Sequence, residues 1–135
     1  MPDTTARRVL IVEDEALIAM LLEQMVLDLG YEVVGPASTV DEALSLLERD
    51  PCDGAVLDVT LGNGVLSTPV AEALRAKGVP FLFASGHGAA GVDNAGDAPV
   101  LTKPFFFGDL EKALHGLFDA PTGPIAAEQK TKASG

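Results

Sequence analysis

Residues 54–64 read GAVLDVTLGNG, an apolar run that ends in an acid and is followed by a glycine-rich loop. A short, continuous apolar run of this kind predicts a β-strand that is covered on both faces. Four further segments have the same character, although the second is more polar and is expected at a sheet edge. They are RVLIV (8–12), YEVVG (31–35), PFLFA (80–84) and VLTK (100–103). The chain is therefore predicted to contain five strands.

Apolar residues at helical spacing separate most of these runs, and capping and stop signals mark where the helices begin and end. The first helix is expected over 17–29 and ends at Gly30, and the second follows a Thr39/Glu42 capping box. The third is expected to be capped by Thr68, to have Pro69 as its first residue and to end near Gly78. The last helix is expected over 106–118.

The alternation of strands and helices predicts an α/β protein with a doubly wound parallel sheet and helices on both faces. The segment 85–99 is rich in glycine and has no apolar periodicity, so we expect its helix to be short or disordered. One domain is expected over 7–118, because 135 residues suit a single core. The polar residues 119–135 are expected to form a flexible tail, with no DNA-binding output module.

The charge balance excludes some partners. Nine basic and twenty acidic residues give a net charge of −11, which argues against direct binding to nucleic acid. No apolar run is long enough to span a bilayer, and the apolar run at the N-terminus is too short for a signal peptide. We therefore expect a cytoplasmic protein without membrane contact. The single cysteine, Cys52, is expected to be a packing residue.

Polar side chains follow four of the predicted strands. Glu13 and Asp14 follow the first strand, Asp58 ends the third, Ser85 ends the fourth and Lys103 ends the fifth. Parallel strands bring these residues to one edge of the sheet, where ligands of doubly wound folds bind. Two carboxylates about 4 Å apart repel each other by about 4 kcal/mol at an effective dielectric constant near 20. Either a proton or a cation must relieve this repulsion. A hard divalent cation suits carboxylate oxygens, so we expect Mg²⁺, with Mn²⁺ as an alternative.

Four motifs at these strand ends resemble those of the receiver domain of two-component response regulators. They are VEDE (12–15), VLDV (56–59), FAS (83–85) and TKPF (102–105), in the order of that family. The resemblance covers about residues 7–118, and it implies a flavodoxin-like sheet with the strand order 2-1-3-4-5.

The resemblance also implies the chemistry of three side chains. Asp58 matches the phosphate acceptor, which takes a phosphoryl group from a sensor histidine kinase or a histidine phosphotransfer protein. Lys103 matches the lysine that pairs with this aspartate and then with a phosphoryl oxygen. Ser85 matches the hydroxyl residue that binds the phosphoryl group. The implied protein is a stoichiometric phosphoacceptor that also dephosphorylates itself, rather than a turnover enzyme, and it acts on a downstream protein or as a relay shuttle or phosphate sink.

The metal ligands implied by the resemblance are Glu13, Asp14, Asp58 and the backbone carbonyl of Thr60, with Asp14 closer to Mg²⁺ than Glu13. The Thr60 side chain has no implied part in this site.

Two features depart from the common pattern of receiver domains. Val100 occupies the position, three residues before the lysine, that is usually aromatic. Together with the glycine-rich segment, the sequences FLFASGHG and KPFFF resemble the FAT GUY subgroup, whose members are often stand-alone receivers paired with kinases of the HWE or a related class. We expect switching to involve an order change in 86–99, because the usual aromatic partner is missing.

Two other functions fit parts of the sequence. A phosphatase of the haloacid dehalogenase type also uses an aspartate at a strand end with Mg²⁺, but it needs a second acid two residues later, where this chain has Thr60. A phosphate-independent interaction module would be expected to have lost Asp58, Asp14 or Lys103, and all three are present.

Overall fold

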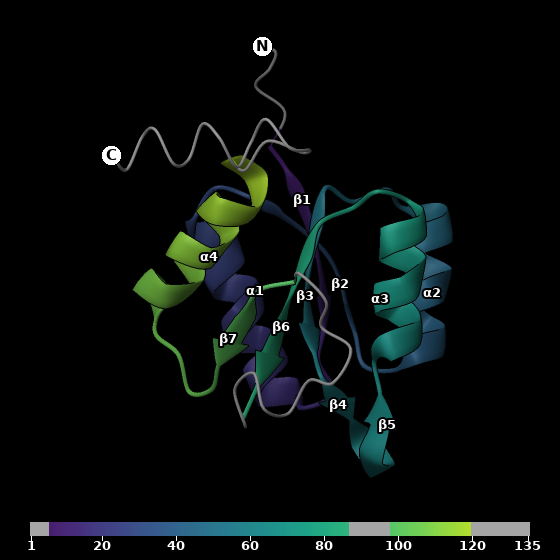
Figure 1. Cartoon of the computed structure of the whole chain (residues 1–135). Helices are drawn as coiled ribbons and strands as arrows, with labels where there is room; N and C mark the ends of the chain where they lie inside the picture. Colours follow the sequence, from purple (N-terminus) through teal and green to yellow (C-terminus); the bar gives the residue numbers. More distant parts are fainter. Residues whose placement is uncertain (1–5, 87–97, 120–135) are drawn as a thin grey trace.

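The computed structural model describes residues 6–86 and 98–119 (Figure 1). Five parallel strands form one sheet in the order β2-β1-β3-β6-β7, which confirms the predicted doubly wound order 2-1-3-4-5. The strands are β1 (Arg8–Val12), β2 (Glu32–Ala37), β3 (Gly54–Asp58), β6 (Phe81–Ser85) and β7 (Val100–Thr102).

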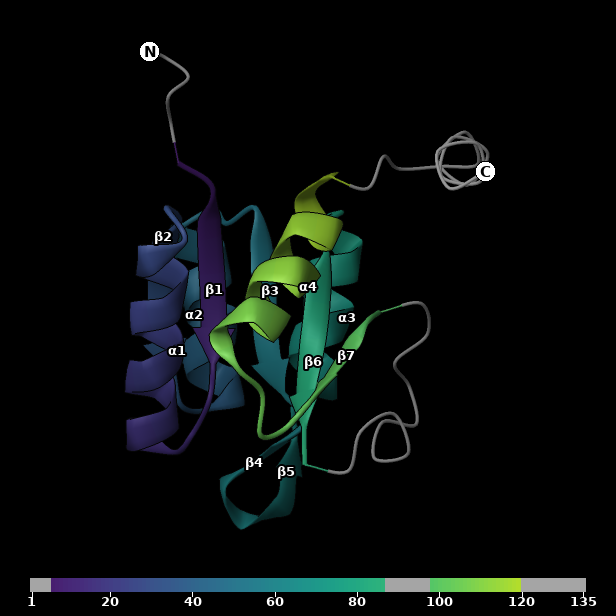
Figure 2. The same ribbon diagram turned by 90° about the vertical axis from the view of Figure 1, so that its left-hand side faces the viewer.

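In the described residues, four helices cover the two faces of this sheet. The helices are α1 (Ala16–Asp28), α2 (Val40–Arg49), α3 (Thr68–Ala76) and α4 (Phe107–Asp119). Figures 1 and 2 show α1 and α4 on one face and α2 and α3 on the other. None of the helices in the described residues is long and apolar enough to cross a membrane.

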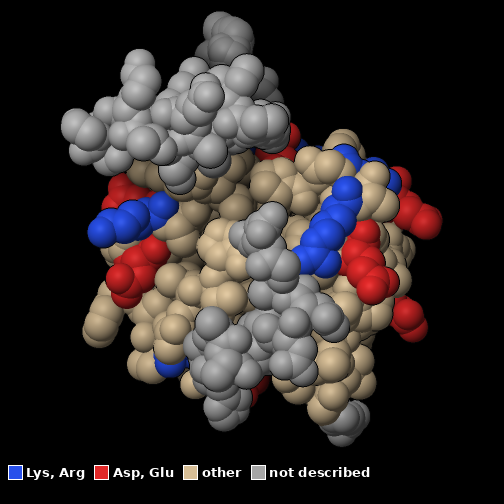
Figure 3. Space-filling model, viewed as in Figure 1, with Lys and Arg blue, Asp and Glu red and all other residues tan. Residues whose placement is uncertain are grey.

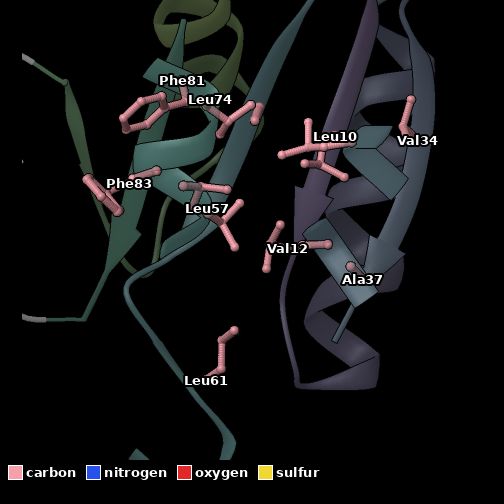
Figure 4. Close-up of a cluster of buried hydrophobic side chains, with 14 residues drawn as sticks. Leu10, Val12, Val34, Ala37, Leu57, Leu61, Leu74, Phe81 and Phe83 are labelled. Carbon is pink, nitrogen blue, oxygen red and sulfur yellow. The ribbon is translucent and has the colours of Figure 1, made fainter. Parts of the chain in front are cut away.

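Each face of the sheet has its own apolar core, because successive side chains of a strand point to opposite faces. Leu10, Val12 and Leu57 point toward α2 and α3, where they pack with Leu74 and Phe83 (Figure 4). The side chains between them in sequence point toward α1 and α4. This second core contains Val9, Ile11, Leu22, Val26, Val56, Leu82, Ala84, Leu110 and Leu114. The central strands are thus buried on both faces, as their continuous apolar sequences predicted.

The second strand lies at the sheet edge, as expected, but it continues past its predicted end to Ala37. The pairing register with β1 shifts between Leu10 and Val12, opposite Gly35. Gly35 has a φ of +95°, and a Cβ atom there would lie 2.8 Å from the Ala37 nitrogen. Glycine therefore permits the bulge that restores pairing between Val12 and Ala37.

Helix starts agree with the sequence only in part. The Glu42 N–H donates to Thr39 Oγ1 (3.1 Å), but the Glu42 carboxylate accepts from the Ser38 N–H (2.8 Å), one residue earlier than a standard capping box. Thr68 was predicted to cap the third helix and instead lies inside it. Ser67 is the N-cap, and its backbone carbonyl, rather than its side chain, accepts the first helical N–H groups.

A small antiparallel hairpin after β3 was not predicted. Its strands are β4 (Thr60–Leu61) and β5 (Val65–Leu66), joined by a 3₁₀ turn, η1 (Gly62–Gly64). Figures 1 and 2 show that the hairpin extends past the carboxyl end of β3.

The predicted short or disordered helix falls largely on residues 87–97, which lie outside the described residues. The predicted tail beyond Asp119 also lies outside them, so both remain predictions, as do the domain limits 7 and 118.

Candidate functional site

The carboxyl edge of the sheet gathers three acids from two neighbouring strands. Val12 of β1 pairs with Leu57 of β3, so the residues that follow them emerge side by side. One carboxylate oxygen each from Glu13, Asp14 and Asp58 lies within 4.8 Å of the others. The structure therefore brings together the three carboxylates that the sequence placed at this edge.

Glu13 is the most deeply buried member of the cluster, with a side chain that is 1% exposed. Its Oε2 accepts the Glu15 N–H (3.2 Å), and its Oε1 accepts from Lys103 Nζ (3.1 Å). Burial raises the pKa of Glu13, and the hydrogen bonds from Lys103 and Glu15 only partly oppose that rise. The bond to Glu15 also ties this carboxylate to the start of α1, where Glu15 is the N-cap.

Asp58 ends β3, and its side chain is 12% exposed. Burial raises its pKa as well, and the charge of Asp14 adds to the rise, while the Lys103 ammonium opposes it. Lys103 Nζ lies 3.3 Å from Asp58 Oδ1. For both Asp58 and Glu13, the effect of burial on the pKa therefore outweighs the opposing effect of the Lys103 ammonium.

Lys103 comes from the loop that follows β7, and its ammonium contacts both buried acids. Burial alone would lower the pKa of Lys103, but the hydrogen bond with Glu13 and the charge of Asp58 outweigh this effect and raise it. The contact with Asp58 was expected from the sequence, whereas the equally close contact with Glu13 was not. Sequence alone offered no sign of it, because it depends on the rotamer of a long side chain.

Ser85 and Thr60 lie beside this cluster. Ser85 is buried at the end of β6, one residue past the partner of Asp58, and its carbonyl accepts the Lys103 N–H (2.8 Å). Thr60 pairs with Leu66, and the flanking bond from Ser67 N–H to the Val59 carbonyl makes this a non-hydrogen-bonded pair. The Thr60 carbonyl therefore points away from the hairpin partner.

The chemistry of this donor set fits a hard divalent cation. Carboxylate oxygens predominate, and Mg²⁺ prefers oxygen ligands. Three carboxylates share the edge with one ammonium, so the cluster keeps an excess of negative charge. No histidine or cysteine belongs to this group in the described residues. The site is thus suited to Mg²⁺ rather than to zinc.

A family model described as the response regulator receiver domain matches residues 9–115. The chain belongs to the response regulator receiver family. Receiver domains obtain a phosphoryl group from histidine kinases and bind Mg²⁺ through acidic residues, and this chain has an acidic cluster at the carboxyl edge of its sheet.

Among named relatives of this receiver, the transcriptional regulatory protein PdtaR of Mycobacterium tuberculosis is 36% identical over 112 residues. The match covers 80% of this chain but only 55% of PdtaR, so the chain spans about half the length of that relative.

Two solved receiver structures are also similar. The BeF3-activated conformation of SdrG from Pseudomonas melonis Fr1 is 47% identical, with a TM-score of 0.72 and coverage of 84% of this chain and 98% of SdrG. The PhyR receiver domain from Erythrobacter litoralis is 25% identical, with a TM-score of 0.79 and coverage of 90% and 96%. The chain is thus similar in structure to receivers of the PhyR and SdrG type.

Proposed function

We propose that this protein is a response regulator that accepts a phosphoryl group on Asp58 from a sensor histidine kinase or a histidine phosphotransfer protein. The observation that carries this proposal is the position of the Asp58 carboxylate. It lies within 4.8 Å of two further acids and 3.3 Å from the Lys103 ammonium. The BeF3-activated conformation recorded for SdrG supports the same assignment.

In the proposed reaction, an Asp58 oxygen attacks the phosphorus of a phosphohistidine. An oxygen–phosphorus bond forms while the nitrogen–phosphorus bond breaks, and the imidazole nitrogen keeps the electron pair and takes up a proton. Lys103 holds the acceptor oxygen in place before transfer and then pairs with a phosphoryl oxygen. The Ser85 hydroxyl binds another phosphoryl oxygen. Such transfer depends mainly on positioning and charge compensation.

The residues that would hold Mg²⁺ are Asp14, Asp58, Glu13 and the Thr60 carbonyl, with Mn²⁺ as an alternative ion. When bound, the ion supplies positive charge that offsets the repulsion between these acids and an anionic phosphoryl group. The outward direction of the Thr60 carbonyl supports its place in this set.

The phosphorylated protein would then signal by contact with a downstream protein, or pass the phosphoryl group on as a shuttle or sink. Water would later hydrolyse the acyl phosphate within the same site, so the protein acts stoichiometrically. The motifs shared with the FAT GUY subgroup favour a kinase of the HWE or a related class as the donor. We place this activity in the cytoplasm.

The test is labelling by acetyl phosphate in the presence of Mg²⁺. The wild type is expected to take up one phosphoryl group, detected by intact mass, and to lose it slowly. Asp58→Asn is expected to remain unlabelled, and Asp41→Asn, an exposed aspartate on α2, serves as the matched control. Equal labelling of Asp58→Asn and wild type would remove Asp58 from this role.

A further inference from the structure

The hairpin formed by β4, η1 and β5 carries two exposed aliphatic side chains. Val65 is 48% exposed and Leu66 is 53% exposed. They lie within the segment Val59–Ala71, which contains no charged residue, although 21% of the chain is charged. Exposing apolar side chains to water costs free energy, and such exposed patches often mark interaction sites. The hairpin does not need these two side chains for its own stability, because other residues of the segment are buried.

The base of the hairpin is fixed to the body of the protein. Leu61 is buried in the core on the α2 and α3 face, and Ser67 is fully buried at the start of α3. The Ser67 N–H donates to the Val59 carbonyl (2.9 Å), which closes the base of the ribbon. Val65 and Leu66 are therefore exposed on a hairpin whose base is fixed, so ordering them on binding would cost little conformational entropy.

The hairpin lies directly beside the phosphoacceptor. Only Val59 separates Asp58 from β4, and Figures 1 and 2 show that the ribbon extends past the carboxyl end of β3. The Asp58 side chain is only 12% exposed, so it is recessed relative to this projection. Reacting atoms must approach to about 3–3.5 Å before transfer. A protein donor that reaches Asp58 at this distance would come close to the hairpin, whereas a small donor need not touch it.

Charge favours the same contact. Acids surround the phosphoacceptor, and a phosphohistidine donor is itself anionic at its reactive centre. An uncharged contact beside that centre adds apolar attraction without adding repulsion. The occupant that fits is therefore a protein that presents apolar side chains next to a phosphohistidine.

We propose that Val65 and Leu66 form a docking element for the protein phosphodonor and that they determine transfer from a protein but not from a small molecule. This inference rests on the proposed function of Asp58. It assigns a specific role to Val65 and Leu66, which belong to neither the acidic cluster nor the proposed metal ligands.

The experiment compares two donors with the variant Val65→Thr/Leu66→Gln, which keeps residues compatible with a strand. The protein donor is the sensor kinase of the same genome that transfers ³²P to the wild type fastest, and the small donor is acetyl phosphate. The variant is expected to lose about tenfold in kcat/KM with the kinase, mainly through KM, and to be labelled by acetyl phosphate at the wild-type rate. Leu27→Ser is the control, because Leu27 is 46% exposed near the far end of α1.

Unchanged kinetics with the kinase would overturn the docking role while leaving the proposed function of Asp58 intact. An equal loss with both donors would also overturn it, because the hairpin would then act on the site itself. No labelling of the wild type by any kinase or by acetyl phosphate would instead refute the proposed function, and the inference with it. Circular dichroism and the unfolding midpoint of the variant establish that it is folded before the rates are compared.

Discussion

Replacing Asp58 with asparagine is expected to stabilise the metal-free protein. The substitution keeps the size of the side chain and removes one of three carboxylates that lie within 4.8 Å of one another. At 4.8 Å, the upper limit of these separations, each repulsion of Asp58 by Glu13 or Asp14 amounts to about 3.5 kcal/mol at an effective dielectric constant of 20. The attraction to Lys103 at 3.3 Å is about 5 kcal/mol on the same scale.

The two repulsions together exceed the attraction by about 2 kcal/mol, so removal of the Asp58 charge is favourable. Partial exposure reduces this figure, and we expect the free energy of unfolding to rise by about 1–2 kcal/mol at pH 7, or about 4–8 °C in Tm. Added Mg²⁺ should stabilise the wild type by several degrees and Asp58→Asn by much less, because the variant has lost both the repulsion and a ligand.

The assay is urea unfolding followed by circular dichroism, in EDTA and in 10 mM Mg²⁺. In EDTA the wild type is also expected to lose stability as the pH rises from about 4. Asp58 and Glu13 have folded pKa values above their ordinary values of 3.8 and 4.5, so the folded state binds more protons in this window. A variant equal to or less stable than wild type in EDTA at pH 7 would refute this account of the site's electrostatics.

Three further predictions concern residues outside the acidic cluster of Glu13, Asp14 and Asp58. Gly54→Ala should lower the free energy of unfolding by about 1–3 kcal/mol in urea unfolding, because the added Cβ would lie 2.8 Å from the Phe118 ring. Adding Phe118→Leu to the same chain should recover part of this loss. No loss in the single variant would contradict the packing. Burial raises the pKa of Cys52 to about 11 from 9.0. Because only the thiolate reacts, alkylation of Cys52 by iodoacetamide at pH 8 should be about 100-fold slower than that of an unhindered thiol. A normal rate would show that the thiol is accessible. Hydrogen bonds from Ser38 lower the pKa of Glu42. Because Glu42 is exposed and solvent screens its charge, Glu42→Gln should lower the free energy of unfolding by only about 0.3–0.5 kcal/mol at pH 7, and by nothing once the pH falls below the folded pKa. A pH-independent difference would argue against the charged cap.

The sequence alone predicted correctly those features that follow from a single strong pattern of apolar residues. Continuous apolar runs such as VLIV identify strands that are buried on both faces, and the acids that follow them must then meet at one edge. The carboxylates of Glu13, Asp14 and Asp58 and the ammonium of Lys103 were brought to that edge as expected. Their chemical roles remain proposals.

Other features depend on contacts that the local sequence does not encode. The extension of β2 to Ala37 requires a bulge at Gly35, which only the pairing with β1 makes apparent. Ser67 displaced Thr68 as the N-cap because the hairpin fixes its backbone through Val59. The hairpin itself was missed because its strands have two residues each, too few for a period-two pattern to be recognised.

The backbone bond between Lys103 and Ser85 has a consequence for how the state of the site is transmitted. Lys103 directly follows β7, the outermost strand of the described sheet, and its N–H is anchored to the carbonyl that ends β6. Its side-chain ammonium also forms ion pairs with the carboxylates of Glu13 and Asp58. Lys103 therefore connects the charge of the acidic cluster, through its side chain and its backbone N–H, to both the last strand of the described sheet and the end of its neighbour β6.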